Sequence, residues 1–155
     1  MEFFRTLKRD PLSFLRGVLR ANATFSILSG IVMIAGGARL GAWLGKAGSV
    51  ALDGVVLLMF AAVILWITRA ETVGLKVAGV IVALDAVYVV DTVRQILTGQ
   101  FSTAGNWFYG IVTLVVLDFA ILQLSALLEA ARQRSTARAW YEQSVKDEET
   151  DGIRQ

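Results

Sequence analysis

Long runs of apolar residues, separated by short polar segments, divide the chain into four spans. The runs cover about residues 19–36, 50–68, 74–97 and 107–128. Each contains roughly 20 mainly apolar residues, the length that an α-helix needs to cross a hydrocarbon core of about 30 Å. The helices of a soluble bundle keep a polar face, whereas stretches such as 55–67 and 77–90 are apolar nearly all round a helix. The pattern therefore predicts an all-α, membrane-embedded four-helix bundle.

Local signals place the ends of the first helix. Asp10 followed by Pro11 is typical of a helix N-terminus, because aspartate caps free N–H groups and proline lacks an N–H. Gly36 and Gly37 are expected to end this span.

The chain is expected to have three parts. Residues 1–10 form a short cytoplasmic interfacial segment, and residues 11–128 form the four-span transmembrane domain. Residues 129–155 are expected to be cytoplasmic, with an amphipathic helical extension to about Tyr141 and then an acidic, poorly ordered tail.

Basic residues predict the orientation in the membrane. They cluster before the first span and after the last: Arg5, Lys8, Arg9, Arg16, Arg20, Arg132, Arg134 and Arg138. The loop after the first span holds only Arg39 and Lys46, and the loop after the third holds essentially no basic residue. Because cytoplasmic segments are enriched in Lys and Arg, we expect a multi-pass protein of a bacterial inner membrane with both termini in the cytoplasm. We interpret the clusters as anchors to anionic lipid of the bilayer and expect no nucleic-acid partner.

The composition excludes several kinds of site. The chain has no Cys and no His among its 155 residues. Thiolate metal sites, Cys nucleophiles, bis-histidine haem and Ser-His-Asp triads are therefore excluded. The glycines form no phosphate-binding pattern. We expect no enzyme activity, no cofactor and no metal site.

Two aspartates interrupt the apolar runs close to the bilayer midplane, Asp85 in the third span and Asp118 in the fourth. An aspartate at the centre of a membrane helix costs about 2.5–3.5 kcal/mol on insertion scales, so each is expected to face protein or water. Antiparallel neighbouring helices would bring the two to a similar depth. Helical spacing adds further polar residues, and the candidate intramembrane polar site consists of Asp85, Asp118, Asn22, Ser26, Ser29, Tyr88, Thr92 and Ser125.

This site has two interpretations. Asp85 and Asp118 could form a proton-carrying or cation-binding pair, since two carboxyls held close in a low dielectric do not both ionise easily. Alternatively, each could be a structural, protonated aspartate that donates to a hydroxyl group (Ser26, Ser29, Tyr88 or Thr92) and fixes the helix register. Gln123 is expected to bond a neighbouring helix or a second protomer, and Asp91 is expected to pair with Arg94 or contact Arg39.

The run from Arg20 to Gly30 (RANATFSILSG), the Leu84-Asp85 pair and Gln123 resemble features of small, uncharacterised bacterial membrane proteins with four spans. The resemblance covers most of residues 15–130. It implies the fold and carries over no activity.

Three functions are compatible with the sequence. The first is a membrane protein without catalysis that acts through helix–helix contacts, as an accessory subunit of a membrane-protein partner or as a homo-oligomer. The second is a small proton- or cation-coupled transporter or channel that uses the aspartate pair. The third, a lipid-active enzyme, has the least support because no nucleophile has an identifiable base.

Overall fold

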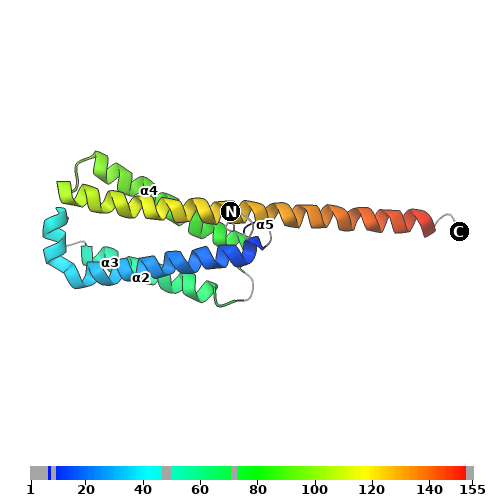
Figure 1. Ribbon diagram of the computed structural model, residues 1–155, viewed down its shortest axis with the longest axis horizontal. Coiled ribbons are helices and arrows are strands. Elements are labelled where there is room, and N and C mark those ends of the chain that lie inside the picture. The colour runs from blue at the N-terminus through cyan, green and yellow to red at the C-terminus, as the bar shows by residue number, and fades with distance from the viewer. Residues whose placement is uncertain (1–6, 8–9, 47–49, 71–72, 153–155) are drawn as a thin grey trace.

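The computed structural model describes residues 7, 10–46, 50–70 and 73–152, with the backbone alone for residues 145–152. Within these residues the fold is entirely α-helical, as the sequence predicts, with four helices and no strand. The helices are α2 (Pro11–Leu44), α3 (Val50–Ile67), α4 (Leu75–Leu97) and α5 (Thr103–Gly152). Figure 1 shows two antiparallel hairpins, α2 with α3 and α4 with α5, lying side by side. Apart from Leu7 and Asp10, the expected interfacial segment at residues 1–10 lies outside the described residues.

Helix α2 begins where the sequence predicts. The Asp10 carboxylate accepts a hydrogen bond from the Ser13 backbone N–H at 3.0 Å, and Pro11 is the first helical residue. This arrangement satisfies one of the N–H groups that have no partner in the first turn of a helix.

The expected end of this helix at Gly36 and Gly37 is wrong. Gly37 has φ 42° and ψ −126°, which kinks the helix, but the helical backbone resumes and runs to Leu44. The additional turns are held by packing, because the Leu44 side chain is fully buried in an apolar cluster with Phe101 and Tyr109. A glycine pair is therefore a bend here and not a terminus.

The two helices of the first hairpin approach closely at a pair of glycines. A Cβ atom added to Gly30 would lie 2.8 Å from the Gly54 carbonyl oxygen, and one added to Gly54 would lie 2.7 Å from the Gly30 carbonyl oxygen. Small residues let membrane helices come together in this way. The glycine pair fixes the crossing point of α2 and α3.

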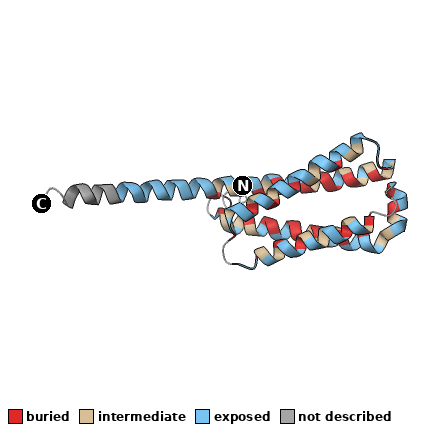
Figure 2. Cartoon of the chain, turned by 180° about the vertical axis from the view of Figure 1, so that it is seen from behind, coloured by how far each residue is buried: buried red, intermediate tan, exposed pale blue. Residues whose placement is uncertain are grey.

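Helix α5 is the longest element, with 50 residues, and it corrects the expectation of a poorly ordered tail. It begins at Thr103, earlier than expected, and remains helical through Gly152. The chain's single proline is Pro11, so no proline interrupts α5, and an Arg138–Glu142 ion pair at 3.2 Å spans one turn of the extension. Figure 2 shows that the extension leaves the other helices as a straight rod, and its side chains are exposed from residue 131 to residue 144.

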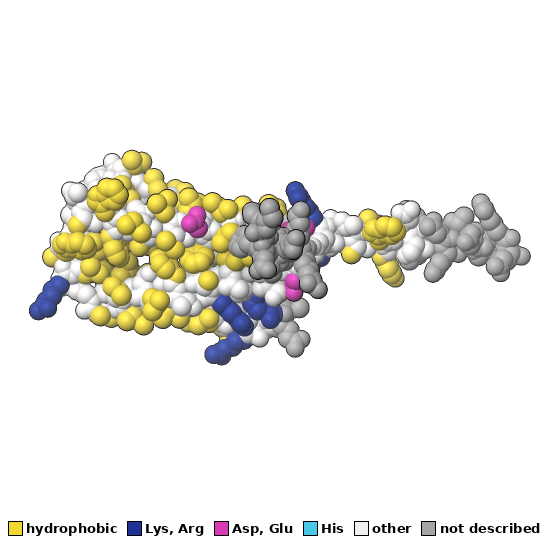
Figure 3. Space-filling view, viewed as in Figure 1, with side chains coloured by type: hydrophobic (Ala, Val, Ile, Leu, Met, Phe, Trp, Pro, Cys, Tyr) yellow, Lys and Arg dark blue, Asp and Glu magenta, His cyan; other side chains and the backbone are white. Residues whose placement is uncertain are grey.

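Three helices, α2, α3 and α5, are long and apolar enough to cross a membrane. Large apolar side chains are exposed on all four helices, for example Ile31, Met59, Val87 and Ile121. Figure 3 shows hydrophobic side chains over most of the body, with Lys and Arg gathered towards its two ends. This distribution matches a body surrounded by lipid. Helix α4 is 23 residues long and carries four charged side chains, those of Lys76, Asp85, Asp91 and Arg94.

The packing leaves one seam of the body open. Helix α2 packs against both α3 and α5, and α4 packs against α5, whereas α3 and α4 make almost no direct contact. At the end from which the rod emerges, an apolar cluster that includes Leu15, Ile64 and Ile81 joins the helices. At the opposite end, the cluster around Leu44 and Phe101 does the same. The gap between α3 and α4 lies between these two clusters.

Candidate functional site

A buried carboxyl group, that of Asp85 in α4, ties three helices together. The side chain is 3% exposed, and one of its oxygens, Oδ2, accepts two hydrogen bonds. The Asn22 side-chain amide on α2 donates the first over 2.9 Å, and the Gln123 side-chain amide on α5 donates the second over 3.1 Å. Both amide side chains are buried as well. Because buried polar groups need partners, these two bonds fix the register of α2, α4 and α5.

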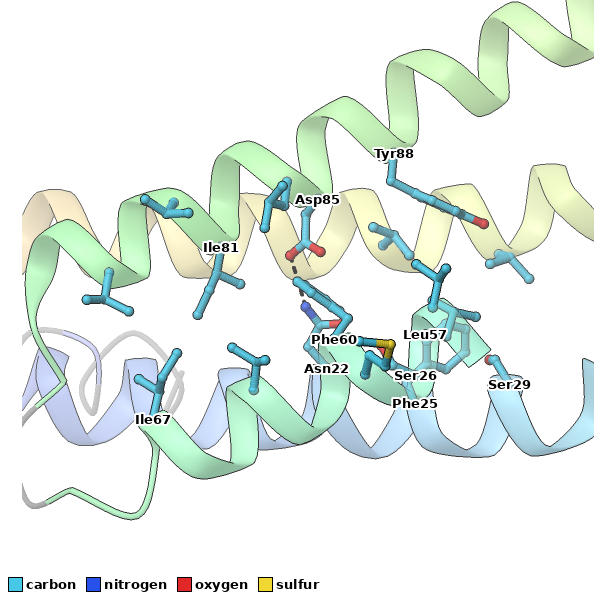
Figure 4. A pocket seen from close by; sticks show the side chains of 18 residues that line it. Asn22, Phe25, Ser26, Ser29, Leu57, Phe60, Ile67, Ile81, Asp85 and Tyr88 are labelled. Carbon is cyan, nitrogen blue, oxygen red and sulfur yellow. Dashed lines mark hydrogen bonds between the residues drawn. The ribbon is translucent and has the colours of Figure 1, made fainter. Parts of the chain in front are cut away.

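Asp85 also lines a cavity of about 560 Å³ in the open seam. The walls are apolar and come mainly from α3 and α4, with Val56, Phe60 and Leu84 among them. The polar groups are few: the cavity is lined by Asn22, Ser26, Ser29, Asp85 and Tyr88. Figure 4 shows Asp85 reaching from α4 towards Asn22 on α2, with Phe60 and Tyr88 nearby. We call this space the α3–α4 cleft.

The polar atoms around Asp85 are only partly paired. Among the described residues, the second carboxylate oxygen, Oδ1, accepts no hydrogen bond, since both amides bind Oδ2. The Gln123 carbonyl oxygen Oε1 is buried and also without a partner among these residues. Ion pairs in the described part of the chain join Lys46 to Asp53, Arg94 to Asp91 and Arg138 to Glu142, and none involves Asp85. The carboxyl group is therefore held by neutral donors only.

The expected pair of Asp85 and Asp118 does not form. Asp118 lies on the exposed side of α5, among exposed apolar residues such as Leu114, Ile121 and Leu124. The buried side of α5 runs instead through Val112, Val116, Ala120, Gln123 and Ala126. Asp118 lies two residues from both Val116 and Ala120, which is about half a helical turn, so its side chain is on the opposite side of α5 and points away from Asp85.

The other predicted site residues divide between two places. Asn22, Ser26, Ser29 and Tyr88 lie around the cleft with Asp85, as the helical spacing predicts. Ser125 is separate from it: its hydroxyl donates to the Ile121 carbonyl of its own helix over 2.8 Å. The partners expected for Asp85 were hydroxyl groups, and the residues that bond it are the amides of Asn22 and Gln123 instead.

Thr92 is buried beside a second, smaller cavity of about 180 Å³ near the loops that join the helices of each hairpin. Here the Lys46 ammonium lies 3.0 Å from Asp53 Oδ2 and 5.7 Å from the ring centroids of Phe101 and Tyr109. These two rings stack at 4.3 Å. The sequence interpretation did not pair Lys46 with Asp53.

The two cavities are neighbours, because Val56, Leu57 and Tyr88 line both of them. On the rim of the smaller cavity, the expected local pair is confirmed: Arg94 binds Asp91 over 3.0 Å. Gln95 also donates to Asp91 over 2.6 Å. Polar side chains therefore extend from Asp85 through the two neighbouring cavities to the end of the body opposite the rod.

The donor atoms in the cleft are suited to binding and positioning. No cluster of three or more Asp, Glu, His or Cys side chains that could hold a metal ion occurs in the described ranges. Pockets for small molecules are typically 300–1,000 Å³, mainly apolar, with a few convergent polar groups. The α3–α4 cleft has these properties.

No protein-family model, curated protein or solved structure matches this chain, so the resemblance to bacterial four-span proteins stays a hypothesis.

Proposed function

We propose that this protein binds an elongated, largely apolar molecule inside the membrane and does not catalyse its conversion. The α3–α4 cleft is the binding site, and Asp85 holds the polar end of the molecule. One observation carries the proposal: a cavity of about 560 Å³, apolar on its walls, is lined by a buried carboxyl group, one oxygen of which has no hydrogen-bond partner among the described residues. The cleft lies where two helices fail to pack, so a ligand enters sideways from the lipid.

The proposal includes a place in the cell. We place the protein in a bacterial inner membrane with α4 as a fourth span and both termini in the cytoplasm. Supporting this placement, α4 is 23 residues long, about 34 Å as a helix, and Figure 1 has the start of α2 and the rod of α5 at the same end of the body. Arg132, Arg134 and Arg138 lie at this end.

A photoreactive alcohol tests the binding site. Purified protein in lipid nanodiscs would be irradiated with a ten-carbon alcohol that carries a diazirine, and the labelled peptides would be mapped by mass spectrometry. We expect saturable labelling of α3 and α4 residues that line the cleft. Labelling that spreads over all lipid-facing helices and does not saturate would contradict the proposal.

Two matched variants sharpen this test. Val80 lines the cleft and is 59% exposed, and Val87, one heptad later on α4, is 64% exposed but does not line it. Val80→Trp should block the cleft and abolish saturable labelling, and Val87→Trp should leave it intact. Both substitutions are on exposed positions, so neither should disturb the fold.

A second function, that of an accessory subunit, is favoured by the position of Asp118. This carboxyl is exposed on an apolar face of α5, next to lipid in the proposed arrangement, where it costs about 2.5–3.5 kcal/mol at mid-depth. A membrane helix of another protein with an amide, a hydroxyl or a basic group at that depth would relieve this cost.

Purification in mild detergent tests this second function. A stoichiometric partner should remain with the parent chain and be lost from Asp118→Leu, whereas Val80→Trp should retain it. If the parent chain purifies alone as a monomer, this function is excluded. If the companion is a second copy of the chain, the interface joins a homo-oligomer and not an accessory complex.

A further inference from the structure

We infer that the ligand of the α3–α4 cleft is a cationic amphiphile, an alkyl or aryl chain that ends in a protonated amine. This inference rests on the proposed function and names the class of molecule that the cleft would take. It is carried by three features of the site: the carboxylate oxygen that has no partner among the described residues, the absence of Lys and Arg from the described residues that line the cleft, and the aromatic side chains that line it.

The first feature is an acceptor left open towards the cleft. Asp85 uses Oδ2 for both the Asn22 and the Gln123 amide, so Oδ1 remains available to a donor from the ligand. An ammonium group offers up to three donors, and hydrogen bonds to charged groups are roughly twice as strong as neutral ones. Gln123 does not line the cleft, so its role is to hold Oδ2 and leave Oδ1 to the ligand.

The second feature is the uncompensated charge. The described Lys and Arg side chains that form ion pairs do so with Asp53, Asp91 and Glu142, outside the cleft. Among the described residues that line the cleft, Asp85 is the only acid and there is no Lys or Arg. A buried carboxylate held only by neutral amides is complementary to a ligand that brings its own positive charge.

The third feature is aromatic. Phe25, Phe60 and Tyr88 line the same cleft as Asp85, and Figure 4 shows that Phe60 comes from α3 and Tyr88 from α4. Aromatic faces attract cations, and more strongly where water is excluded. The remaining walls are aliphatic and fit a hydrocarbon chain.

A head-group series with one chain length tests the inference. Decylamine, decanol and decanoate would compete with the photoreactive alcohol for labelling of the parent protein at neutral pH, where the amine is protonated. We expect decylamine to compete at about tenfold lower concentration than decanol or better, and decanoate to be the weakest competitor. Equal competition by the amine and the alcohol would overturn the inference, and this comparison needs no variant.

Two substitutions locate the charge that makes the difference. Asp85→Asn should bring the amine and the alcohol to within about twofold of each other, because an amide can bond either head group, and Asp85→Glu should restore the preference for the amine. Asp118→Asn removes the other mid-depth carboxyl and should leave the preference unchanged. A preference that survives in Asp85→Asn, or disappears in Asp118→Asn, would place the cation elsewhere and contradict the inference.

These outcomes separate the inference from the proposed function. If the labelling is saturable and Val80→Trp blocks it, but the amine competes no better than the alcohol, the cleft binds a neutral ligand. This result would refute the cationic ligand and leave the proposed binding function intact. If the photoreactive alcohol does not label the cleft saturably in the parent, both fail together.

Discussion

Asp85, Asn22 and Gln123 form the one polar junction that connects α2, α4 and α5 among the described residues. Both amide side chains are fully or almost fully buried, and each donates a hydrogen bond to the same carboxylate oxygen. Interhelical hydrogen bonds of this kind contribute about 0.6 kcal/mol on average in a membrane protein and up to about 2 kcal/mol. The junction is thus expected to specify register more than to supply most of the stability.

Replacing Gln123 tests this expectation. Gln123→Leu keeps the approximate volume and removes the donor to Asp85, so we expect a loss of about 0.5–2 kcal/mol in the free energy of unfolding. Reversible unfolding in mixed micelles, followed by circular dichroism, measures the change. Ser125→Ala is the control on the same helix, because the Ser125 hydroxyl bonds only its own helix backbone. A Gln123→Leu protein as stable as the Ser125→Ala protein would show that the junction contributes nothing.

At the scale of single helices, the crossing of α2 and α3 depends on two glycines. Gly30→Ala would place a methyl group 2.8 Å from the Gly54 carbonyl oxygen, so the two helices must move apart. Overpacking of this kind is destabilising by roughly 1–3 kcal/mol, and we expect a lower melting temperature.

Gly110→Ala is the matched control for this prediction. A Cβ at Gly110 meets nothing within 4 Å, and alanine is the better helix former by up to about 1 kcal/mol. The control should therefore melt at the same temperature or higher. Equal melting of the parent and the Gly30→Ala protein would mean that the crossing is looser than the two glycines indicate.

The helices could be predicted from the sequence because their signals are local. Asp10 with Pro11 placed the start of α2, and the apolar runs placed α3 and α4 to within a residue or two. Gly37 misled the prediction, since a positive φ at one glycine is compatible with both a terminus and a kink. Tertiary packing of Leu44 decides between them, and no local pattern reports that packing.

The site could be predicted in part. The stripe of Asn22, Ser26 and Ser29 on α2 was recognised because the spacing of three to four residues is that of a helix face. On α5 two stripes competed, one through Asp118 and one through Gln123. The structure buries the second. A signal in the sequence that would have favoured the stripe through Gln123 is its run of small or β-branched residues, such as Val116, Ala120 and Ala126, because such residues let helices approach closely.

For the molecule as a whole, the open seam between α3 and α4 and the rod of α5 give the body two distinct ends. The end with the rod carries Arg132, Arg134 and Arg138, and the opposite end carries Lys46 close to Asp53. Beyond Ala130, the last buried residue of α5, residues 131–152 add about 33 Å of helix at 1.5 Å per residue. In the proposed arrangement, with α5 crossing the bilayer, this extension projects beyond the lipid headgroups on its side of the membrane.

The placement of α4 decides whether the rod and the N-terminus share a side, and cysteine labelling tests it. The chain has no cysteine, so Ala42→Cys at one end and Ala139→Cys on the rod each introduce a single reactive thiol at an exposed position. With four spans and the orientation proposed above for an inner membrane, a membrane-impermeant maleimide should label Ala42→Cys from the periplasm and Ala139→Cys only after the membrane is opened. If α4 does not cross the bilayer, α5 leaves on the same side as residue 42, and both thiols react from that side. The labelling pattern of these two thiols therefore distinguishes three crossings from four, because the number of crossings decides on which side of the membrane α5 emerges.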